Sequence, residues 1–313
     1  MRILLTGASS FTGYWFAKEL VQAGHHVFAT FRGERKSYQG VRRTRVEQVL
    51  NLLEPLWNMD VGSTAFLELV RGTKFDLYCH HASMMDNYRS WDFDAIEATK
   101  KNTQSARSIL SALVNNGCQK AIITGSVFEP FEGVGDTGHR AFNPYGLSKH
   151  FSFEIYRMEA HRLGVRIGKF VIPNPFGPLE EPRFTTYLAN EWAAGRTPMV
   201  KTPDYIRDNI HVGLLAMAYR TFCESLSSQV GVSRADPSGY IESQGAFANR
   251  VAREFGLRTG KALEVQCTPQ VEHSEPLIRV NATPSAQSYS QWSEARAWDE
   301  ACEYWLEISR SRT

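Results

Sequence analysis

Residues 1–13, MRILLTGASSFTG, decide the fold that we expect for this chain. Residues 3–5 form a short apolar run that indicates a buried strand, and a turn of small residues follows and closes at Gly13. Residues 14–21 then have the apolar spacing of a helix. A strand, a small-residue turn and a helix in this order form a cradle for phosphate, because Gly7 permits a sharp turn and the helix N-terminus offers unpaired N–H groups and a positive dipole end.

The composition sets the class of protein. The chain has 313 residues, enough for one large domain with a smaller lobe, and its 42% apolar and 22% charged residues are typical of a soluble globular protein. The net charge of +2, with both signs interspersed, favours neither nucleic acid nor a membrane surface as a partner. No apolar run approaches the roughly 18 residues of a membrane span, and no signal peptide is visible, so we expect a cytoplasmic protein.

Strand and helix patterns alternate along the first half of the chain. After the first strand, further strands are expected at residues 27–31, 58–61, 75–82, 118–126 and 165–172, with helices at 63–70, 92–115 and 145–163, while residues 46–53 are apolar but of unclear type. Six strands with helices between them predict an α/β protein, a doubly wound parallel sheet of the Rossmann kind. Beyond Pro173 the rhythm breaks, which predicts a smaller C-terminal α/β lobe. We expect residues 1–173 and about 209–235 to bind a dinucleotide, and residues 174–208 and about 236–313 to bind substrate.

The end of the second strand selects the dinucleotide. In this fold an acidic residue there binds both ribose hydroxyls of NAD, whereas an arginine accommodates the 2′-phosphate of NADP. No acid closes this strand: Arg32 does, and Arg35 and Lys36 follow closely. The sequence therefore favours NADP(H) over NAD(H). A solvated basic loop is the alternative.

Polar residues at two further places have alternative roles. Asp60 comes where the third strand of such a sheet lies against the adenine, so it is either an acceptor for the adenine amine or a helix cap near Ser63. His80 and His81 are adjacent on a strand and point to opposite faces, and no third ligand has suitable spacing, so we expect no metal. The five cysteines, Cys79, Cys118, Cys223, Cys267 and Cys302, form neither a disulfide framework nor a zinc motif.

Three residues form a candidate catalytic group. Ser126 ends the fifth strand, and Tyr145 and Lys149 are four residues apart, so they project from one face of a helix. A phenol has an ordinary pKa near 10, and an ammonium one turn away stabilises the phenolate and lowers that pKa. We expect Tyr145 to act as acid or base, Lys149 to assist it and to hold the nicotinamide ribose, and Ser126 to orient the substrate oxygen.

A second Tyr-x-x-x-Lys motif occurs at Tyr14 and Lys18. Spacing does not distinguish the two motifs, but position does. Tyr14 follows directly on the phosphate turn, whereas Tyr145 comes after the fifth strand, whose carboxyl end is where a doubly wound sheet binds its ligand. We therefore place the catalytic pair at Tyr145 and Lys149.

Together these features resemble the extended short-chain dehydrogenase/reductase family, in particular its nucleotide-sugar epimerases, dehydratases and 4-ketoreductases, over nearly the whole chain. Residues 6–13, TGASSFTG, match the family's TGxxGxxG with Ser10 in place of the middle glycine, and HHAS at residues 80–83 is similar to H-L-A-A with His81 in place of leucine. Asp60-Val61 matches the family's adenine-side pair, and Asn102 matches an asparagine that shapes its active site. The resemblance places Ser10 against the pyrophosphate, where we expect its hydroxyl to bind.

Ser126, Tyr145 and Lys149 match the family's catalytic residues. Two later motifs point to a sugar nucleotide: residues 174–178, NPFGP, are similar to N-x-Y-G-P, and residues 207–212, RDNIHV, to R-D-F-I-x-V. The acidic residue that follows the second motif in the family is absent. The resemblance implies that the cofactor contacts Gly7, Ser9, Ser10, Phe11, Thr12, Gly13, Arg32, Asp60, Val61, His81, Ala82, Asn102, Tyr145, Lys149 and Pro173. It implies that the substrate contacts Ser83, Met84, Asn174, Arg183 and Arg207. For the two arginines, the alternative is that they are surface charges without a ligand.

The resemblance leaves two enzyme functions open. A reductase would use NADPH to reduce a 4-keto (6-deoxy) nucleotide sugar, in deoxysugar or surface-polysaccharide synthesis, whereas an epimerase would keep NAD(P) bound through a cycle. Arg32 favours the reductase. Dehydration is disfavoured because Val127 and Phe128 stand where a dehydratase carries an Asp-Glu pair. A non-catalytic NADP sensor is disfavoured because Tyr145 and Lys149 are both present. We also expect a homodimer.

Overall fold

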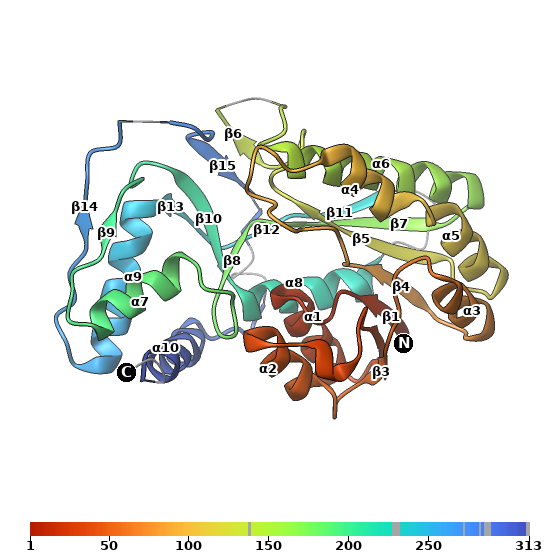
Figure 1. The fold of residues 1–313 in the computed structure, drawn as a ribbon, viewed down its shortest axis with the longest axis horizontal. Helices are drawn as coiled ribbons and strands as arrows, with labels where there is room; N and C mark the ends of the chain where they lie inside the picture. Colours follow the sequence, from red (N-terminus) through yellow and green to blue (C-terminus); the bar gives the residue numbers. More distant parts are fainter. Residues whose placement is uncertain (137–138, 227–231, 272, 282, 285–288, 311–313) are drawn as a thin grey trace. The chain divides into compact units, whose positions relative to one another are not determined.

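Figure 1 shows a computed structural model of the chain, which describes residues 1–136, 139–226, 232–271, 273–281, 283–284 and 289–310. The chain divides into two compact units. The first unit consists of residues 1–132, 139–172 and 216–236, and the second of residues 133–138, 173–215 and 237–313. Each unit is built from separate stretches of the chain, so its sheet and its core depend on contacts between residues far apart in the sequence.

The first unit is organised on a sheet of seven strands. Its order is β11-β7-β5-β4-β1-β2-β3, and all neighbouring strands are parallel. The order reverses between β1 and β4, which is the place where a doubly wound sheet binds its ligand. The strands are β1 (Arg2–Thr6), β2 (His26–Thr30), β3 (Glu54–Leu56), β4 (Leu77–His80), β5 (Lys120–Ser126), β7 (Arg166–Ile172) and β11 (Val232–Ala235).

Helices cover both faces of this sheet (Figure 1). One layer contains α3 (Thr64–Gly72), α5 (Ala106–Asn115) and α6 (Pro144–Leu163), with α4 (Ala95–Thr103) beside α6. Its core includes Phe66, Tyr78 and Ile109, all with less than 1% of their surface exposed. The other layer contains α1 (Phe11–Gln22), α2 (Gly40–Val49) and α8 (Val212–Ser225), where Phe16 of α1 stacks on Tyr219 of α8. The predicted doubly wound α/β fold is confirmed.

Two predicted elements differ in the structure, and the stretch left without a type is now assigned. Residues 92–115 form two helices, because α4 ends at Thr103 and α5 begins at Ala106. The third strand is residues 54–56, and residues 58–61 are a loop. The apolar stretch 46–53 is the end of α2 followed by a turn. The single turn η1 (Arg35–Ser37) lies in the basic segment after β2.

The second unit has a mixed sheet packed against three helices. The strand order of the sheet is β13-β10-β15-β6, with β8 also paired to β10. Two separate pairs of short strands, β12–β16 and β9–β14, belong to the same unit. The helices surround a core of aromatic side chains that includes Phe176, Trp298 and Trp305. Its helices are α7 (Phe184–Ala193), α9 (Gln244–Thr259) and α10 (Glu294–Arg310), and its strands are β6 (Val134–Gly135), β8 (Asn174–Phe176), β9 (Met199–Val200), β10 (Ile206–His211), β12 (Pro237–Ser238), β13 (Tyr240–Ser243), β14 (Gln266–Cys267), β15 (Ile278–Val280) and β16 (Thr283–Pro284).

The two units differ from the predicted division at three places. Pro173, expected in the dinucleotide-binding part, lies in the second unit. Residues 133–136, which supply β6, pair with β15 and so belong to the second unit. Residues 209–215, expected in the dinucleotide-binding part, also belong to the second unit, and the first resumes at Ala216. Residues 137–138 and 227–231, which are predicted to belong to the dinucleotide-binding part, lie outside the described residues.

Candidate active site

The turn between β1 and α1 requires its glycines. Gly7 has φ +78°, and a Cβ on it would lie 2.9 Å from the main-chain N of Ala82. A Cβ on Gly13 would lie 2.2 Å from the carbonyl oxygen of Gly7. Thr6 Oγ1 accepts from the N–H groups of His81 (3.0 Å) and Ala82 (2.9 Å), which joins the turn to the end of β4. The tight turn at the N-terminus of α1 fits the pyrophosphate of a dinucleotide, because side chains there would block the approach of an anion.

The hydroxyl of Ser10 is turned into the protein. It donates to the carbonyl oxygen of Gly7 at 2.8 Å, accepts from the N–H of Gly13 at 3.2 Å as the N-cap of α1, and lies 3.1 Å from Nε2 of His81. The expectation that this hydroxyl itself binds the pyrophosphate does not fit these contacts. Ser10 shapes the turn, and the free N–H groups at the start of α1, near Phe11 and Thr12, are the donors left for an anion.

His81 links three hydroxyl groups below the phosphate turn. Its Nε2 lies 3.1 Å from both Ser10 Oγ and Thr12 Oγ1, and its Nδ1 lies 3.0 Å from Thr124 Oγ1 of β5. Enclosure of the ring, with the charge of Lys149 as a smaller cause, lowers the pKa of His81 to about 3. The ring is therefore neutral at pH 7, with one nitrogen donating and the other accepting. Sequence comparison with the family identified both departures, Ser10 and His81, but not that they contact each other.

At the end of β2, the arginines have different surroundings. Arg35 forms an ion pair with Glu47 of α2, so its guanidinium is already engaged. Arg32 is exposed directly after Phe31, whose ring stacks on Trp57 at a centroid distance of 4.6 Å. Of the two arginines in this segment, Arg32 is the one at the strand end where the fold places the adenosine ribose. The role of Arg32 in selecting NADP(H) stays a prediction, and the supporting role of Arg35 is weakened by its ion pair.

The loops after β3 and β4 show what Asp60 and Asn102 contact. Ser63 caps α3 by accepting from the N–H of Phe66 at 3.2 Å, so the capping role considered for Asp60 belongs to Ser63, and Asp60 is exposed. Val61 is partly buried against the core. Asn102 Oδ1 accepts from the N–H of Met84 at 2.9 Å, and its Nδ2 donates to Ser83 Oγ at 3.1 Å. Asn102 therefore fixes the two residues predicted to meet the substrate.

Tyr145 lies in the first turn of α6. Asn143 caps this helix through the N–H of Gly146 (2.9 Å), and Pro144 occupies its first position, which suits the absent N–H of proline. The ring of Tyr145 is 7% exposed and packs edge-on against Tyr88 and Phe93, with centroid distances of 5.2 and 5.9 Å. The aromatic residues exclude water from one side of the phenol.

Lys149 follows one turn later on α6 and is also 7% exposed. Burial lowers the pKa of Lys149 to about 8, while the charge of Glu129 opposes this and that of Lys169 adds to it. Ser126 ends β5, and its Oγ accepts from the N–H of Phe128 at 3.2 Å, which leaves its own proton free to donate. All three residues belong to the first unit: Ser126 lies at the carboxyl end of β5, and Tyr145 and Lys149 lie on α6.

The competing motif on α1 has a packing role. The hydroxyl of Tyr14 donates to Gln48 Oε1 of α2 at 2.8 Å, and the ammonium of Lys18 lies 4.7 Å from the centre of the Trp15 ring. Burial raises the pKa of Tyr14 above its usual value, which is the opposite of what an acid or base near pH 7 needs. These contacts agree with the choice of Tyr145 and Lys149.

The remaining predicted residues lie in the second unit. Pro173 is its first residue after β7. Asn174 Nδ2 donates to Asn209 Oδ1 at 2.6 Å, and Arg183 precedes α7. Arg207 contacts Glu275 at 2.9 Å and donates to the carbonyl oxygen of Leu277 at 3.2 Å.

Sequence reasoning missed Arg279, which is opposite Arg207 in the register of β10 and β15 and is 2% exposed. Burial, with the charge of Arg207 as a further cause, lowers the pKa of Arg279 below its usual value, while Asp136 opposes this. No motif surrounds Arg279 in the sequence, so only the strand pairing brings it to Arg207.

Two further buried histidines, His80 and His211, have local hydrogen-bond partners. The hydroxyl of Tyr78 lies 2.8 Å from Nδ1 of His80, and His211 Nδ1 accepts from the N–H of Gly213 at 3.1 Å. Burial lowers the pKa of each of these histidines to about 3. Within the described residues, no three His, Cys, Asp or Glu side chains are grouped to hold a metal ion. In the same residues, no helix combines the length and the apolar character needed to cross a bilayer.

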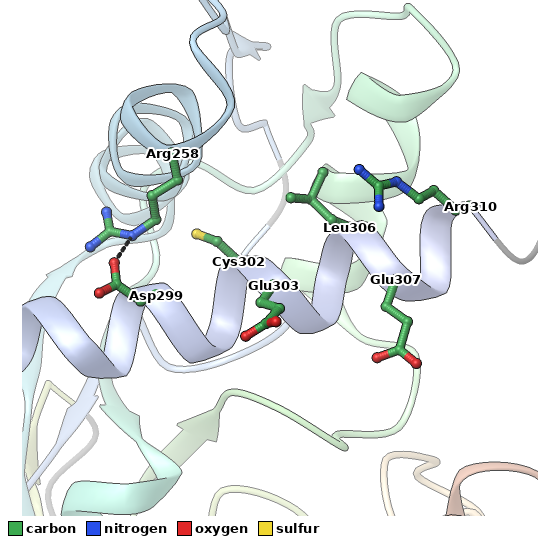
Figure 2. A pocket seen from close by; sticks show the side chains of 7 residues that line it. All are labelled: Arg258, Asp299, Cys302, Glu303, Leu306, Glu307 and Arg310. Atoms are coloured by element: carbon green, nitrogen blue, oxygen red, sulfur yellow. Dashed lines mark hydrogen bonds and ion pairs between the residues drawn. The ribbon is translucent and has the colours of Figure 1, made fainter.

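A surface pocket of about 490 Å³ lies between α9 and α10 in the second unit (Figure 2). Arg258 at its edge is held by Asp299 at 2.7 Å and by Glu254 at 2.9 Å. The pocket contains none of the predicted site residues. Its lining residues are Arg258, Asp299, Cys302, Glu303, Leu306, Glu307 and Arg310. With its arginine already paired, we assign no role to this pocket.

Comparison with solved structures shows the same fold in enzymes of sugar nucleotides. UDP-glucuronic acid 4-epimerase from Bacillus cereus, in complex with UDP-glucuronic acid and NAD, is 16% identical with a TM-score of 0.76, over 98% of this chain and 100% of that one. UDP-glucose-4-epimerase from Stenotrophomonas maltophila, with NAD and formylated UDP-arabinopyranose, is 19% identical with a TM-score of 0.74, over 99% of both chains. The UDP-Glc/GlcNAc 4-epimerase from Campylobacter jejuni is 18% identical with a TM-score of 0.70, over 98% of this chain and 99% of that one.

Comparison with curated proteins finds no match. The sequence model of the NAD-dependent epimerase/dehydratase family, in contrast, matches residues 3–246. The match includes the phosphate turn, the group of Ser126, Tyr145 and Lys149, and Arg207. The chain therefore belongs to the NAD-dependent epimerase/dehydratase family, within the extended short-chain dehydrogenase/reductase enzymes.

Proposed function

We propose that this chain is an NADPH-dependent reductase of a 4-keto nucleotide-diphosphate sugar, as in deoxysugar or surface-polysaccharide synthesis. The observation that carries the proposal is Arg32, exposed at the end of β2 where an acid would select NAD. A guanidinium fork suits a 2′-phosphate. A preference for NADP(H) connects an enzyme to the cellular pool of reductant, which a net reduction consumes.

The reducing chemistry comes from the cofactor, since NADPH supplies a hydride when it is bound. The protein supplies the proton and the orientation. Ser126 donates a hydrogen bond to the carbonyl oxygen of the substrate and turns it towards Tyr145. The phenol of Tyr145 then gives its proton to that oxygen as negative charge develops on it.

Lys149 makes the proton transfer by Tyr145 possible near neutral pH. The phenolate that remains on Tyr145 is stabilised by a positive charge one helical turn away. The pKa of Lys149, lowered to about 8, still lies above 7, so the ammonium is mostly charged there. The surrounding rings of Tyr88 and Phe93 strengthen this interaction because they keep water away from the phenol.

Two arginines support a diphosphate as part of the substrate. Arg207 and Arg279 are opposite each other on β10 and β15 of the second unit, and their positive charges repel. An anion between or beside them would relieve this repulsion, and phosphate oxygens match the geometry of guanidinium groups. We propose that Asn174, Arg183 and Arg207 of the second unit contact the nucleotide sugar. For Ser83 and Met84 of the first unit, contact with the substrate stays a prediction from the sequence.

An epimerase is the second candidate function. The three solved structures described above are UDP-sugar 4-epimerases, and two of them contain NAD. The same residues serve this reaction, because Tyr145 would remove a proton from a sugar hydroxyl and later return it. In that case the cofactor leaves the cycle unchanged.

Absorbance at 340 nm and analysis of the cofactor in the purified protein separate the two reactions. We expect stoichiometric loss of NADPH with a 4-keto-6-deoxy nucleotide sugar. Interconversion of sugar epimers without added cofactor, by protein that carries NAD from purification, would replace the reductase with the epimerase. Binding of NADPH without turnover of any sugar nucleotide in a panel with UDP, GDP, CDP and dTDP would instead indicate a sensor.

A homodimer is proposed from an apolar stripe on α6. Phe151, Ile155 and Met158 are four and three residues apart, so they share one face of the helix, and they are 48%, 38% and 57% exposed. Ile96 on the adjacent α4 is 83% exposed. We expect light scattering to give twice the mass of the chain and the double substitution I155E/M158E to give a monomer. A monomeric unmodified chain would contradict this proposal.

A further inference from the structure

A group of buried charges lies behind Ser126. Lys169 of β7 donates to Glu129 Oε2 at 2.5 Å and contacts Glu132 Oε1 at 2.7 Å, while Arg234 of β11 contacts the other oxygen of Glu132 at 2.8 Å. Glu129, Glu132 and Lys169 are at most 5% exposed. Removing ions from water is costly, so such a group needs a reason beyond stability.

The two carboxylates of this group have different contacts. Glu129 Oε1 accepts from the main-chain N–H of Ser126 at 2.8 Å, and this N–H has one proton to donate. Glu132 is instead shared between Lys169 and Arg234. Glu129 therefore joins the charged group to a catalytic residue, and Glu132 neutralises the far side of Lys169.

The turn after β5 is packed tightly around this contact. A Cβ on Gly125 would lie 2.9 Å from both Glu129 Oε1 and Lys169 Cε, so the two side chains lie directly against the strand. A Cβ on Gly146 of α6 would lie 2.0 Å from the carbonyl oxygen of Phe128, so the turn is also pressed against the start of the helix that carries Tyr145. Movement of the turn would thus displace Ser126 relative to Tyr145.

We propose that Glu129 is a positioning residue of the active site: its carboxylate, anchored by Lys169, fixes the main chain of Ser126 and provides the opposite charge that keeps Lys149 an ammonium. The inference rests on the proposed function for its consequence in catalysis, but the contacts themselves do not depend on the substrate. Among the residues that the structure describes, the titratable groups found to interact electrostatically with Lys149 include Glu129, Lys169, His80 and His81. Both histidines are neutral near pH 7, so Glu129 supplies the negative charge of this set.

The test is a direct titration of Lys149 in the full chain without substrate. Lysine labelled with ¹³C at Cε reports each pKa by NMR, and the Lys149 signal is assigned with K149M. We expect E129Q to lower the pKa of Lys149 by roughly one unit, the effect of losing one nearby opposite charge. E132Q, with the same change of charge beside Lys169, is the matched control and should shift it much less.

The sign of the shift separates this role from a structural one. Loosening of the fold would let water reach Lys149 and raise its pKa, so a fall in E129Q has no such explanation. K169Q removes a like charge and should raise the pKa of Lys149. This second variant tests the same interaction if E129Q does not fold. Equal shifts in E129Q and E132Q, or no shift in E129Q, would overturn the proposal.

Turnover gives a second reading once a substrate is known. The alkaline limb of the kcat profile should move to lower pH in E129Q and stay in place in E132Q, because the ammonium of Lys149 assists Tyr145. If no sugar nucleotide is turned over, the proposed function fails while the NMR titration still decides the role of Glu129.

Discussion

The phosphate loop, residues 6–13, and the catalytic group, Ser126, Tyr145 and Lys149, are supported by different kinds of contact. Behind the phosphate loop, the support is neutral: hydroxyl groups and the uncharged ring of His81. Behind the catalytic group, the support is ionic, through Glu129 and Lys169. The phosphate loop follows β1 and Ser126 ends β5, two strands of one parallel sheet that are separated by β4.

The difference follows from what each region must do. A phosphate loop attracts an anion with main-chain N–H groups and a helix dipole, and a carboxylate behind it would repel that anion. A neutral histidine stabilises the loop without adding charge. The catalytic group instead needs a proton on Lys149 near neutral pH, and a buried ammonium keeps its proton when an opposite charge is close. Changes in the first region should therefore affect cofactor binding, and changes in the second should affect turnover.

The largest expected effect is that of Y145F. Loss of a positioned acid costs about a thousandfold in kcat, within the usual range for general acid catalysis. Binding of NADP⁺, measured by calorimetry, should change little because the aromatic ring and the helix remain. Y14F in the second Tyr-x-x-x-Lys motif is the control, and it should lose the bond to Gln48 but keep its turnover. Equal losses of turnover in the two variants would remove Tyr145 from the mechanism.

The next effect concerns Arg32 and should appear in binding alone. R32D replaces the expected partner of the 2′-phosphate with a repelling charge, and a charge-assisted hydrogen bond corresponds to about tenfold to a hundredfold in affinity. We expect NADP⁺ to bind more weakly by that factor and NAD⁺ to be preferred. R35Q should leave the preference unchanged, since Arg35 is paired with Glu47. An unchanged preference in R32D would contradict the assignment of NADP(H).

The apolar strands of the first unit could be predicted from the sequence because they are buried on both faces. β1, β2, β4, β5 and β7 appear as short apolar runs, and the structure places each within the predicted range or at most one residue from it. The edge strands gave weaker signals. β3 contains Pro55, which is tolerated at an edge but conceals the strand, and β11 is half-exposed without an apolar run. The break between α4 and α5 falls at Gln104 and Ser105, which are compatible with a continuing helix.

The candidate site was predictable where chemistry lies in a local motif. The turn around Gly7 and the pair Tyr145 and Lys149 are of this kind. The contacts that support them join residues far apart in the chain: Ser10 meets His81 across 71 positions, and Glu129 meets Lys169 across 40. Such pairs leave no periodic signal in one sequence, so folding is needed to reveal them.

A smaller effect is expected for the contact between Ser10 and His81. H81L removes the ring nitrogens that contact the hydroxyl groups of Ser10, Thr12 and Thr124. The loss of these hydrogen bonds should lower the free energy of unfolding by about 1–3 kcal/mol. S10G should cost less, because glycine is an acceptable N-cap. The loss of unfolding free energy in the double variant should be smaller than the sum of the losses in the two single variants, because each substitution removes the same contact. Urea unfolding and the Kd for NADP⁺ measure the coupling.

The control for that coupling is Ser9, which is adjacent in the same turn and is not part of the contacts of His81. The costs of S9G and H81L should add. If the costs of S10G and H81L also add, the contact between Ser10 and His81 contributes nothing to the loop. The neutral support would then consist of the contacts of His81 with Thr12 and Thr124 and of the two bonds from the end of β4 to Thr6.

The smallest expected effect is on how the free energy of unfolding depends on pH, because the two regions titrate in different pH ranges. The pKa of His81 is about 3 when folded and about 6.5 when unfolded, so the unfolded chain binds more protons between these values and stability falls as pH falls from about 6.5 towards 3. The pKa of Lys149 is about 8 when folded and about 10.5 when unfolded, so stability rises between pH 8 and 10.5 as the buried charge is lost.

Each proton changes the free energy of unfolding by at most about 1.4 kcal/mol per pH unit. Urea unfolding across pH should show that H81L flattens the acidic window and leaves the alkaline window unchanged. K149M should flatten the alkaline window and change the acidic slope only slightly, because the charge of Lys149 is a smaller cause of the lowered pKa of His81. The acidic slope will not vanish in H81L, because His80 and His211 have the same lowered pKa. If H81L also changed the alkaline window, or if K149M changed the acidic window as much as H81L does, the neutral ring and the ammonium would be strongly coupled, and the two regions would act as one electrostatic unit.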